Sequence, residues 1–337
     1  MIELFIAFFR SLAPVFVLMM IGMGLRRIGV VGTRGTNLLS KAVILFFFPV
    51  LVFHRLASTA DPNQLLENWI IHVWAFVILI GSGLIGYLLL KASRTSADAR
   101  TFVFLVAFPN WIYLPLALAG PIWGDEAVRL LILFNIPTQF ILWTVAIWVL
   151  HGTMKGAHAI RYMLLNPGIL SAAAGLLVAF HIVPIHLTTE GVGWSVAGLN
   201  PILHFIGGLT VPLSVVALGL YLGERVPVRE GALGEVMLVI AGRLFIAPVI
   251  LIGLVLAATK LGVPSTQMVR WVLYLIIAMP VAVSAPLFAE MFNRDRHLAA
   301  RGVVATTLVG LISSPVLVVG AIQCEIWMGI ATAVTGP

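Results

Sequence analysis

The sequence predicts an all-α integral membrane protein with ten transmembrane helices, built as two inverted halves of five helices each. Three observations predict it: hydrophobic residues make up 61% of the 337 residues, charged residues only 10%, and mean hydropathy is +1.10. A soluble domain needs about a quarter of its residues charged to cover its surface. So few charges cannot build a water-facing shell, and lipid must therefore be the main solvent of this chain.

Composition also excludes several classes of function. The net charge of +7 does not indicate nucleic-acid binding, because Lys and Arg lie in short clusters between apolar runs, where they orient a protein in a bilayer. Cys324 is the single cysteine, so we expect no internal disulfide and no cysteine metal site. No HExxH or GxSxG motif occurs. We therefore expect neither an enzyme nor a bound metal or cofactor.

Ten apolar segments are long enough to cross a bilayer, which takes roughly 20 residues at about 1.5 Å each. They cover residues 4–25, 37–57, 68–90, 99–120, 127–150, 165–184, 196–222, 234–258, 267–291 and 299–323. The first segment contains Arg10 and Pro14 and lacks a small-residue cleavage site, so we expect a span there and not a removed signal peptide.

Basic residues gather in every second loop between these segments. These loops hold fourteen of the 20 Lys and Arg residues: Arg26, Arg27, Arg34, Lys41, Lys91, Arg94, Arg100, Lys155, Arg161, Arg225, Arg229, Arg294, Arg296 and Arg301. Cytoplasmic loops carry such an excess, so these loops are expected in the cytoplasm. Both termini would then lie outside the cytoplasm, in a protein of the cell (inner or plasma) membrane.

The order of the segments indicates an internal repeat of residues 1–150 and 151–337. Five spans is an odd number, so a duplicated five-helix unit must lie inverted in the membrane. The fourth and ninth spans share one spacing, Pro, five residues, Pro: Pro109 and Pro115 in one, Pro280 and Pro286 in the other. Membrane helices often contain proline, so this spacing alone could arise by chance. Together with the inverted topology and the matching order of spans, it indicates a repeat.

The paired prolines predict an interruption in each of these two helices. A proline inside a helix removes a backbone hydrogen bond and clashes with the preceding turn. Unpaired backbone groups survive in a membrane only where protein or water covers them. If the two spans cross at their breaks, four half-helix ends meet near the midplane, and two are N-termini that each carry roughly half a positive charge. This arrangement predicts an anion site of the kind found in inverted-repeat transporters.

Six fragments, in order, resemble the auxin efflux carrier family, which includes plant auxin exporters and bacterial malate-permease-like proteins. They are PVFVLMMIGMGLRR from Pro14, ILFFFPVLVF from Ile44, PNWIYLPLALAGPIWG from Pro109, VPLSVVALGLYLGE from Val211, AMPVAVSAPLFAEMF from Ala278 and VVATTLVGLISSPV from Val303. The resemblance implies a scaffold of spans one, two, six and seven, which forms a homodimer. It also implies a transport part of spans three to five and eight to ten, which moves like an elevator and carries organic acids.

Two departures from the family pattern bear on the substrate. The long cytoplasmic insert of many plant members is absent, because the loop between spans five and six covers only about 151–164. The stretch from Asn110 to Pro115 is shorter than usual and lacks the customary glycine. Auxin itself is therefore not implied.

Several uncharged polar residues are candidates for substrate binding near the breaks. Asn110 could contact a carboxylate or cap the following half-helix, and the two roles are compatible. Tyr113 could bond substrate or pack as an aromatic ring, and Ser284 is its equivalent in the other half. Pro109, Pro115, Pro280 and Pro286 would form the crossover itself.

A second group lies on one face of the helix that follows each break. Asn135, Thr138 and Gln139 lie at i, i+3 and i+4, so they share a face that either lines a pathway or makes interhelical hydrogen bonds. Asn135 lies 26 residues after Pro109, and Thr306, with Thr307 beside it, lies 26 residues after Pro280. Ser313 and Ser314, next to Pro315, are expected to satisfy freed backbone groups.

Arg243 is the one strong charge predicted well inside a span. It lies about eight residues, roughly 12 Å, from the nearest helix end. A charge inside the membrane is costly, so we expect Arg243 to have a function in the binding site or in gating. Its partner would be either the anionic substrate or half-helix carbonyls at the crossover. All thirteen Asp and Glu residues fall in loops or end turns, so no carboxylate centre for Na⁺ or H⁺ is expected. Backbone carbonyls and hydroxyls could still hold Na⁺, so coupling to an ion stays open.

Together these features predict a secondary transporter that moves a small organic anion, a carboxylate, by elevator-like alternating access. The site would lie at the crossover of helices four and nine. The alternative is a membrane-embedded sensor or structural protein without transport, a class that has no particular need for two broken helices.

Overall fold

The computed structural model describes residues 2–59, 67–93, 95, 97–111, 113–151, 167–183, 185–186, 194–195, 197–224 and 231–330. This part of the chain is helical apart from two short parallel strands, β1 (Ile185–His186) and β2 (Trp194–Ser195). Six described helical stretches are long and apolar enough to cross a membrane: Thr33–Ser58, Trp69–Ala92, Leu118–His151, Asn200–Gly223, Ala232–Lys260 and Arg296–Trp327. The chain is therefore a multi-pass membrane protein, as composition predicted.

Each of these six stretches corresponds mainly to one predicted span, although Leu118–His151 also includes the last three residues of the predicted fourth span. The other four predicted spans look different. The first corresponds to α1 (Ile2–Arg27), of 26 residues, and the sixth to α10 (Pro167–Ala179), of 13 residues. The fourth and ninth are interrupted, because α6 (Ala99–Ala107) has nine residues and α15 (Gln267–Ile277) has 11. Interruption explains why neither appears as one long helix.

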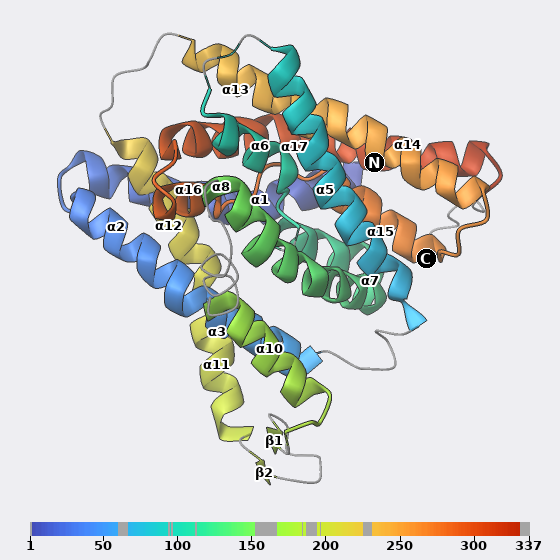
Figure 1. Cartoon of the computed structure of the whole chain (residues 1–337), viewed down its shortest axis with the longest axis horizontal. Coiled ribbons are helices and arrows are strands. Elements are labelled where there is room, and N and C mark those ends of the chain that lie inside the picture. Colours follow the sequence, from blue (N-terminus) through green and yellow to red (C-terminus); the bar gives the residue numbers. More distant parts are fainter. Residues whose placement is uncertain are drawn as a thin grey trace.

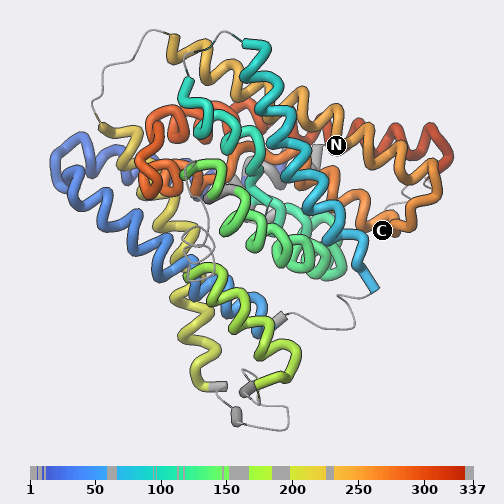
Figure 2. Tube along the Cα trace, in the orientation of Figure 1, coloured from blue at the N-terminus to red at the C-terminus, as the bar shows by residue number. Residues whose placement is uncertain are grey.

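The helices fall into two groups that Figures 1 and 2 show from the same side. The first group contains α1, α2 (Thr33–Ala42), the π-helical turn η1 (Val43–Phe47), α3 (Phe48–Thr59), α10, η3 (Ala197–Leu199), α11 (Asn200–Gly208) and α12 (Thr210–Gly223). In it α1 packs along α12, and α3 packs against α10 and α11. Helices α2, α3, α10 and α11 form the lower and left part of the view in Figure 1.

The second group holds the interrupted helices. It contains α5 (Trp69–Ala92), α6, α7 (Tyr113–Ile141), η2 (Leu142–Ala146), α8 (Ile147–His151), α13 (Ala232–Ile240), η4 (Ala241–Ile246), α14 (Ala247–Lys260), α15, α16 (Ala285–Met291) and α17 (Arg296–Trp327). Within α7 the backbone leaves the helical conformation at Gly124, where φ is 76°. Glycine adopts positive φ without steric cost, so this turn separates the parts of α7 that correspond to the predicted fourth and fifth spans.

Glycines bring α1 and α12 into backbone contact. A Cβ atom on Gly219 of α12 would lie 2.1 Å from the carbonyl oxygen of Met19, and one on Gly22 of α1 would lie 2.3 Å from that of Val216. Gly223 lies one turn beyond Gly219, and small residues four apart let membrane helices approach closely. The two helices come from opposite halves of the sequence, so this contact joins the halves.

A buried ion pair connects the start of α15 to the end of α17. Arg270 Nε donates to Glu325 Oε1, and the side chains of Arg270 and Glu325 are 6% and 0% exposed. Trp271 Nε1 donates to the other carboxylate oxygen at 3.3 Å, and Tyr274 OH donates to Oε1 at 2.7 Å. The sequence did not predict this pair, because no local spacing relates Arg270 to Glu325, 55 positions away.

Replacing Tyr274 by phenylalanine is expected to destabilise the protein by about 1.5–3 kcal/mol, because the buried carboxylate of Glu325 loses one of its donors. Thermal unfolding in detergent measures this loss as a lower Tm. The matched control is Tyr87→Phe: Tyr87 is 45% exposed and its ring lies 5.0 Å from Lys91 Nζ, an interaction that phenylalanine keeps. Equal Tm values for the two variants would contradict the expectation.

Candidate functional site

The two interrupted helices cross at their breaks. After α6 ends at Ala107 and α15 at Ile277, the chain is extended, and Pro109 forms an isolated antiparallel bridge with Val281. The Asn110 N–H donates to the Pro280 carbonyl at 2.8 Å, and the Ala282 N–H donates to the Phe108 carbonyl at 3.1 Å. The interruptions thus lie at the first proline of each predicted pair, and the two segments pair with each other.

The second proline of each pair lies in the helix that follows the break. Pro115 is the third residue of α7, and Pro286 occupies the first turn of α16. In that turn a proline costs little, because the N–H it lacks would have no helical partner. Pro109 and Pro280 therefore mark the breaks, whereas Pro115 and Pro286 mark where the helices resume.

Asn135 and Thr306 each support the break in their own half. The Trp111 indole Nε1 donates to Asn135 Oδ1 at 3.0 Å, and the Val281 N–H donates to Thr306 Oγ1 at 3.2 Å. In both halves, therefore, the residue 26 positions after the first proline accepts a hydrogen bond from one of the two residues that follow that proline. Ser314 adds a bond to the freed Ala278 carbonyl at 2.6 Å, as its position beside Pro315 predicted.

The other polar residues singled out from the sequence bond mostly within their own helix. Thr138 donates to the Phe134 carbonyl, and Thr307 to the Val303 carbonyl. Gln139 Nε2 donates to Asn135 Oδ1 at 2.8 Å. Among these residues, two buried side-chain atoms have no hydrogen-bond partner in the part of the chain that the structure describes: Gln139 Oε1 and Ser313 Oγ. The expectation that Ser313 satisfies a freed backbone group is therefore wrong. The Tyr113 side chain lies outside the described atoms.

Arg243 is fully buried and binds the ends of both interrupted helices. Its Nη1 donates to the Val106 carbonyl in the last turn of α6, at 3.0 Å. Its Nη2 and Nε donate to the carbonyls of Ile277 and Met279, at the end of α15, at 2.5 and 3.1 Å. Helix C-termini carry partial negative charge, so a cation is favourable here. From the sequence, the partner of Arg243 was either the anionic substrate or the half-helix carbonyls. The structure shows contacts with the half-helix carbonyls.

The backbone around Arg243 is also irregular. Arg243 lies within η4, a π-helical turn of six residues between α13 and α14. Such π-bulges are rare and occur frequently at functional sites, where they re-aim a side chain. The sequence carries no signal for this widening of the helix, so it was not expected.

A small pocket lies directly at the crossover, between the two extended segments and α3. Its volume is about 10 Å³, and Phe48, Asn110, Trp111, Val283 and Ser284 are among the residues that line it. Such a volume holds roughly one water molecule. The Phe48 ring, 4% exposed, comes from the first helix group, while the other lining residues belong to the crossover.

Several polar groups around this pocket make no hydrogen bond to any described residue. Among the described residues, neither the Asn110 side-chain amide nor the Ser284 hydroxyl makes a hydrogen bond, although they are only 5% and 8% exposed. The backbone N–H groups of Val283 and Ser284 likewise donate to no described residue. None of the described residues that line the pocket is acidic. Hydrogen bonds are stronger in a nearly closed pocket than in open water, and a bound anion would satisfy these donors.

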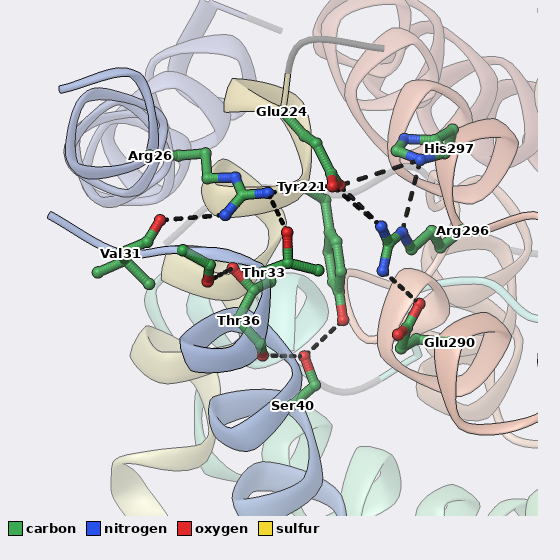
Figure 3. A network of polar contacts seen from close by, with 11 residues as sticks. Arg26, Val31, Thr33, Thr36, Ser40, Tyr221, Glu224, Glu290, Arg296 and His297 are labelled. Carbon is green, nitrogen blue, oxygen red and sulfur yellow. Dashed lines mark hydrogen bonds and ion pairs between the residues drawn. The ribbon is translucent and has the colours of Figure 1, made fainter. Parts of the chain in front are cut away.

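A network of charged residues connects the two helix groups at another place (Figure 3). Glu224, which follows the end of α12, accepts hydrogen bonds from Arg26 of α1 at 3.0 Å and Arg296 of α17 at 2.9 Å. Arg296 also donates to Glu290 of α16 at 2.8 Å, and its guanidinium lies 5.5 Å from the centre of the Tyr221 ring. The sequence did not predict this network, because its members lie far apart in the chain, at the ends of different helices.

The chain shares its sequence pattern with membrane transporters. A family described as "Membrane transport protein" matches residues 7–162 and 157–318. The chain belongs to this family, and the resemblance to auxin efflux carriers drawn from its sequence is confirmed.

A curated protein of Methanothermobacter thermautotrophicus, described as "Uncharacterized transporter", is 25% identical over 312 residues. The matched region covers 91% of this chain and 96% of that protein. The chain is thus similar to that transporter over nearly the whole length of both. Membership of a transporter family implies a protein that carries a solute and does not transform it.

Proposed function

We propose that this protein is a secondary transporter that carries a small organic anion with a carboxylate group across the cell membrane. One observation carries the proposal: at the crossover, the Asn110 amide, the Ser284 hydroxyl and two backbone N–H groups surround a pocket, and they have no partner among the described residues. Hydrogen bonds from such groups to an ionised acceptor are about twice as strong as those between neutral groups. The N-terminus of α7 adds a favourable dipole.

The transported anion would bind between the two extended segments, in the place of the small pocket there. At about 10 Å³, the pocket is too small for a carboxylate while Phe48 lines it. Binding therefore requires that the crossover and α3 separate. This requirement favours alternating access in which the helices of spans three to five and eight to ten move as a transport part against a scaffold of spans one, two, six and seven.

The proposal includes the finer features that the sequence predicts. They are ten spans in two inverted halves, a homodimer formed through the scaffold, and both termini outside the cytoplasm. Fourteen basic residues in alternate loops support the orientation, and the crossover of two interrupted helices supports the inverted halves.

Uptake by proteoliposomes tests the function directly. Purified protein is reconstituted and given a panel of radiolabelled mono- and dicarboxylates, with and without Na⁺ and pH gradients. We expect saturable uptake of at least one carboxylate, and competition by its close analogues but not by the matching amide. Uptake no faster than in protein-free liposomes for every carboxylate would reject the proposal and favour a sensor or structural role.

The network around Glu224 is expected to stabilise the arrangement of the two groups seen here. In Glu224→Gln, both arginines lose a charged partner, and a loss of about 1 kcal/mol in a part-buried network changes a conformational ratio about five-fold. We expect thiol labelling of Ser284→Cys, in a Cys324→Ser background, to become several-fold faster. Glu126→Gln, at an exposed position, is the control. Unchanged labelling in Glu224→Gln would show that the network does not hold this state.

A further inference from the structure

A large apolar groove lies on the outside of the second helix group and shares no lining residue with the crossover pocket. It has a volume of about 490 Å³ and is formed by α5, α6, η2 and α8. Several of its lining side chains are exposed, among them Ile80, Leu84, Val145 and Trp148, at 51%, 57%, 40% and 59%. Both α5 and the α7–α8 stretch are long and apolar enough to span a membrane, so the groove opens toward lipid.

One end of the groove carries a part-buried cation without a partner among the described residues. Arg100, in the first turn of α6, lines the groove, and its Nη1 atom is buried without a hydrogen bond to any described residue. The nearest helix-capping carboxylate, that of Asp98, is engaged by the N–H and hydroxyl of Thr101 and lies 3.8 Å from Arg294. A guanidinium group presents donors that match phosphate oxygens in geometry, and a buried N–H without an acceptor is costly.

A second cation lies at the same end. Tyr87 of α5 lines the groove, and Lys91 Nζ is held 5.0 Å from the centre of its ring. Trp148 also lines the groove near the end of α8, and tryptophan is enriched at the level of lipid headgroups. Positive charge and amphipathic rings at one end, with apolar side chains beyond, match the two parts of an anionic lipid.

The length of the groove fits one leaflet. From Arg100 to Phe108, both of which line it, helical rise gives about 12 Å, close to half of a hydrocarbon core about 30 Å thick. The inner end is formed by Phe104, Ala107 and Phe108. The carbonyl of Phe108 accepts the crossover hydrogen bond from Ala282, so a ligand in the groove would touch the segment that forms the crossover.

We propose that this groove binds one anionic phospholipid, with its phosphate on Arg100 and an acyl chain along α5 and α6. The site is distinct from the carboxylate pocket and does not depend on the transport function. The lipid is selected by its headgroup charge through Arg100 and Lys91, and its acyl chain covers the apolar lining.

Native mass spectrometry of the full-length protein in detergent tests the site, with dioleoyl phosphatidylglycerol and dioleoyl phosphatidylcholine added in turn. We expect the first phosphatidylglycerol to bind roughly ten-fold more tightly than phosphatidylcholine, because both phosphates can accept from Arg100 but the choline cation is repelled by Arg100 and Lys91. Arg100→Gln removes the charge but keeps a polar side chain, and it should abolish this preference. Arg129→Gln, at an exposed position on α7, should keep it.

Two further measurements make the result decisive. Val103→Trp fills the groove, and it should weaken binding of both lipids, which also tests the site if Arg100→Gln fails to fold. Glycerol phosphate, which has no acyl chain, should not displace the bound phosphatidylglycerol. Equal affinity for the two lipids in the unaltered protein, an undiminished preference in Arg100→Gln, or undiminished binding in Val103→Trp would overturn the proposal and leave only non-selective surrounding lipid.

Discussion

Replacing Asn110 by alanine is expected to raise the KM for the transported carboxylate by roughly 10- to 100-fold. The Asn110 amide lines the crossover pocket with no hydrogen-bond partner among the described residues, so its removal affects the bound anion and not the fold. A hydrogen bond to a charged group contributes about 1.5–3 kcal/mol, which corresponds to that change in affinity. Initial rates of uptake over a range of substrate concentrations measure it.

The control for this variant is Ser313→Ala. Ser313 Oγ is buried on α17 and has no partner in the described part of the chain, so its loss removes a hydroxyl without changing the crossover. We expect a KM within about two-fold of the original protein, since no hydrogen bond is lost. Similar KM values in Asn110→Ala and Ser313→Ala would place the substrate away from Asn110.

Arg243→Met is expected to destabilise the protein by about 3–5 kcal/mol and to abolish uptake. The guanidinium satisfies carbonyls at the ends of two helices, and methionine leaves these buried acceptors without donors. Arg243→Lys keeps the charge but cannot reach three carbonyls in one plane, so an intermediate loss of stability is expected. Thermal unfolding in detergent and uptake by proteoliposomes measure the two effects.

Lys260→Met serves as the matched control, because Lys260 is an exposed cation at the end of α14. Its Tm should stay close to that of the original protein. If Arg243→Met kept both its Tm and its uptake, the contacts of Arg243 with the half-helix ends would have no structural importance. If it kept its Tm but lost uptake, Arg243 would act on the substrate and not on the fold.

The interruptions could be predicted from sequence because proline acts locally. Pro109 and Pro280 each lack an amide hydrogen and disturb the preceding turn, whatever surrounds them. The equal spacing to Asn135 and Thr306 then predicted two polar residues in corresponding places, and each supports its own break. The effect of proline is local, and the spacing of 26 residues recurs in both halves, so a single sequence reveals both features.

The long-range contacts could not be predicted in this way. The pair of Arg270 and Glu325 is separated by 55 positions, and Glu224 meets Arg26 across 198 positions. Such pairs form only when tertiary packing brings helix ends together, and their residue types are common in loops of membrane proteins. The choice between substrate and helix ends as the partner of Arg243 also needed coordinates, because both partners carry negative charge.

The backbone contact between α1 and α12 has a consequence for how the protein is made. The glycine face of α1, around Gly22, fits against Val216 of α12, and α12 is synthesised almost two hundred residues later. During synthesis α1 therefore lies in the bilayer without its partner helix. Its glycines then expose backbone that a larger residue would cover. Truncated chains that end before α12 are expected to be cleared by membrane proteases, since the contact between α1 and α12 cannot form.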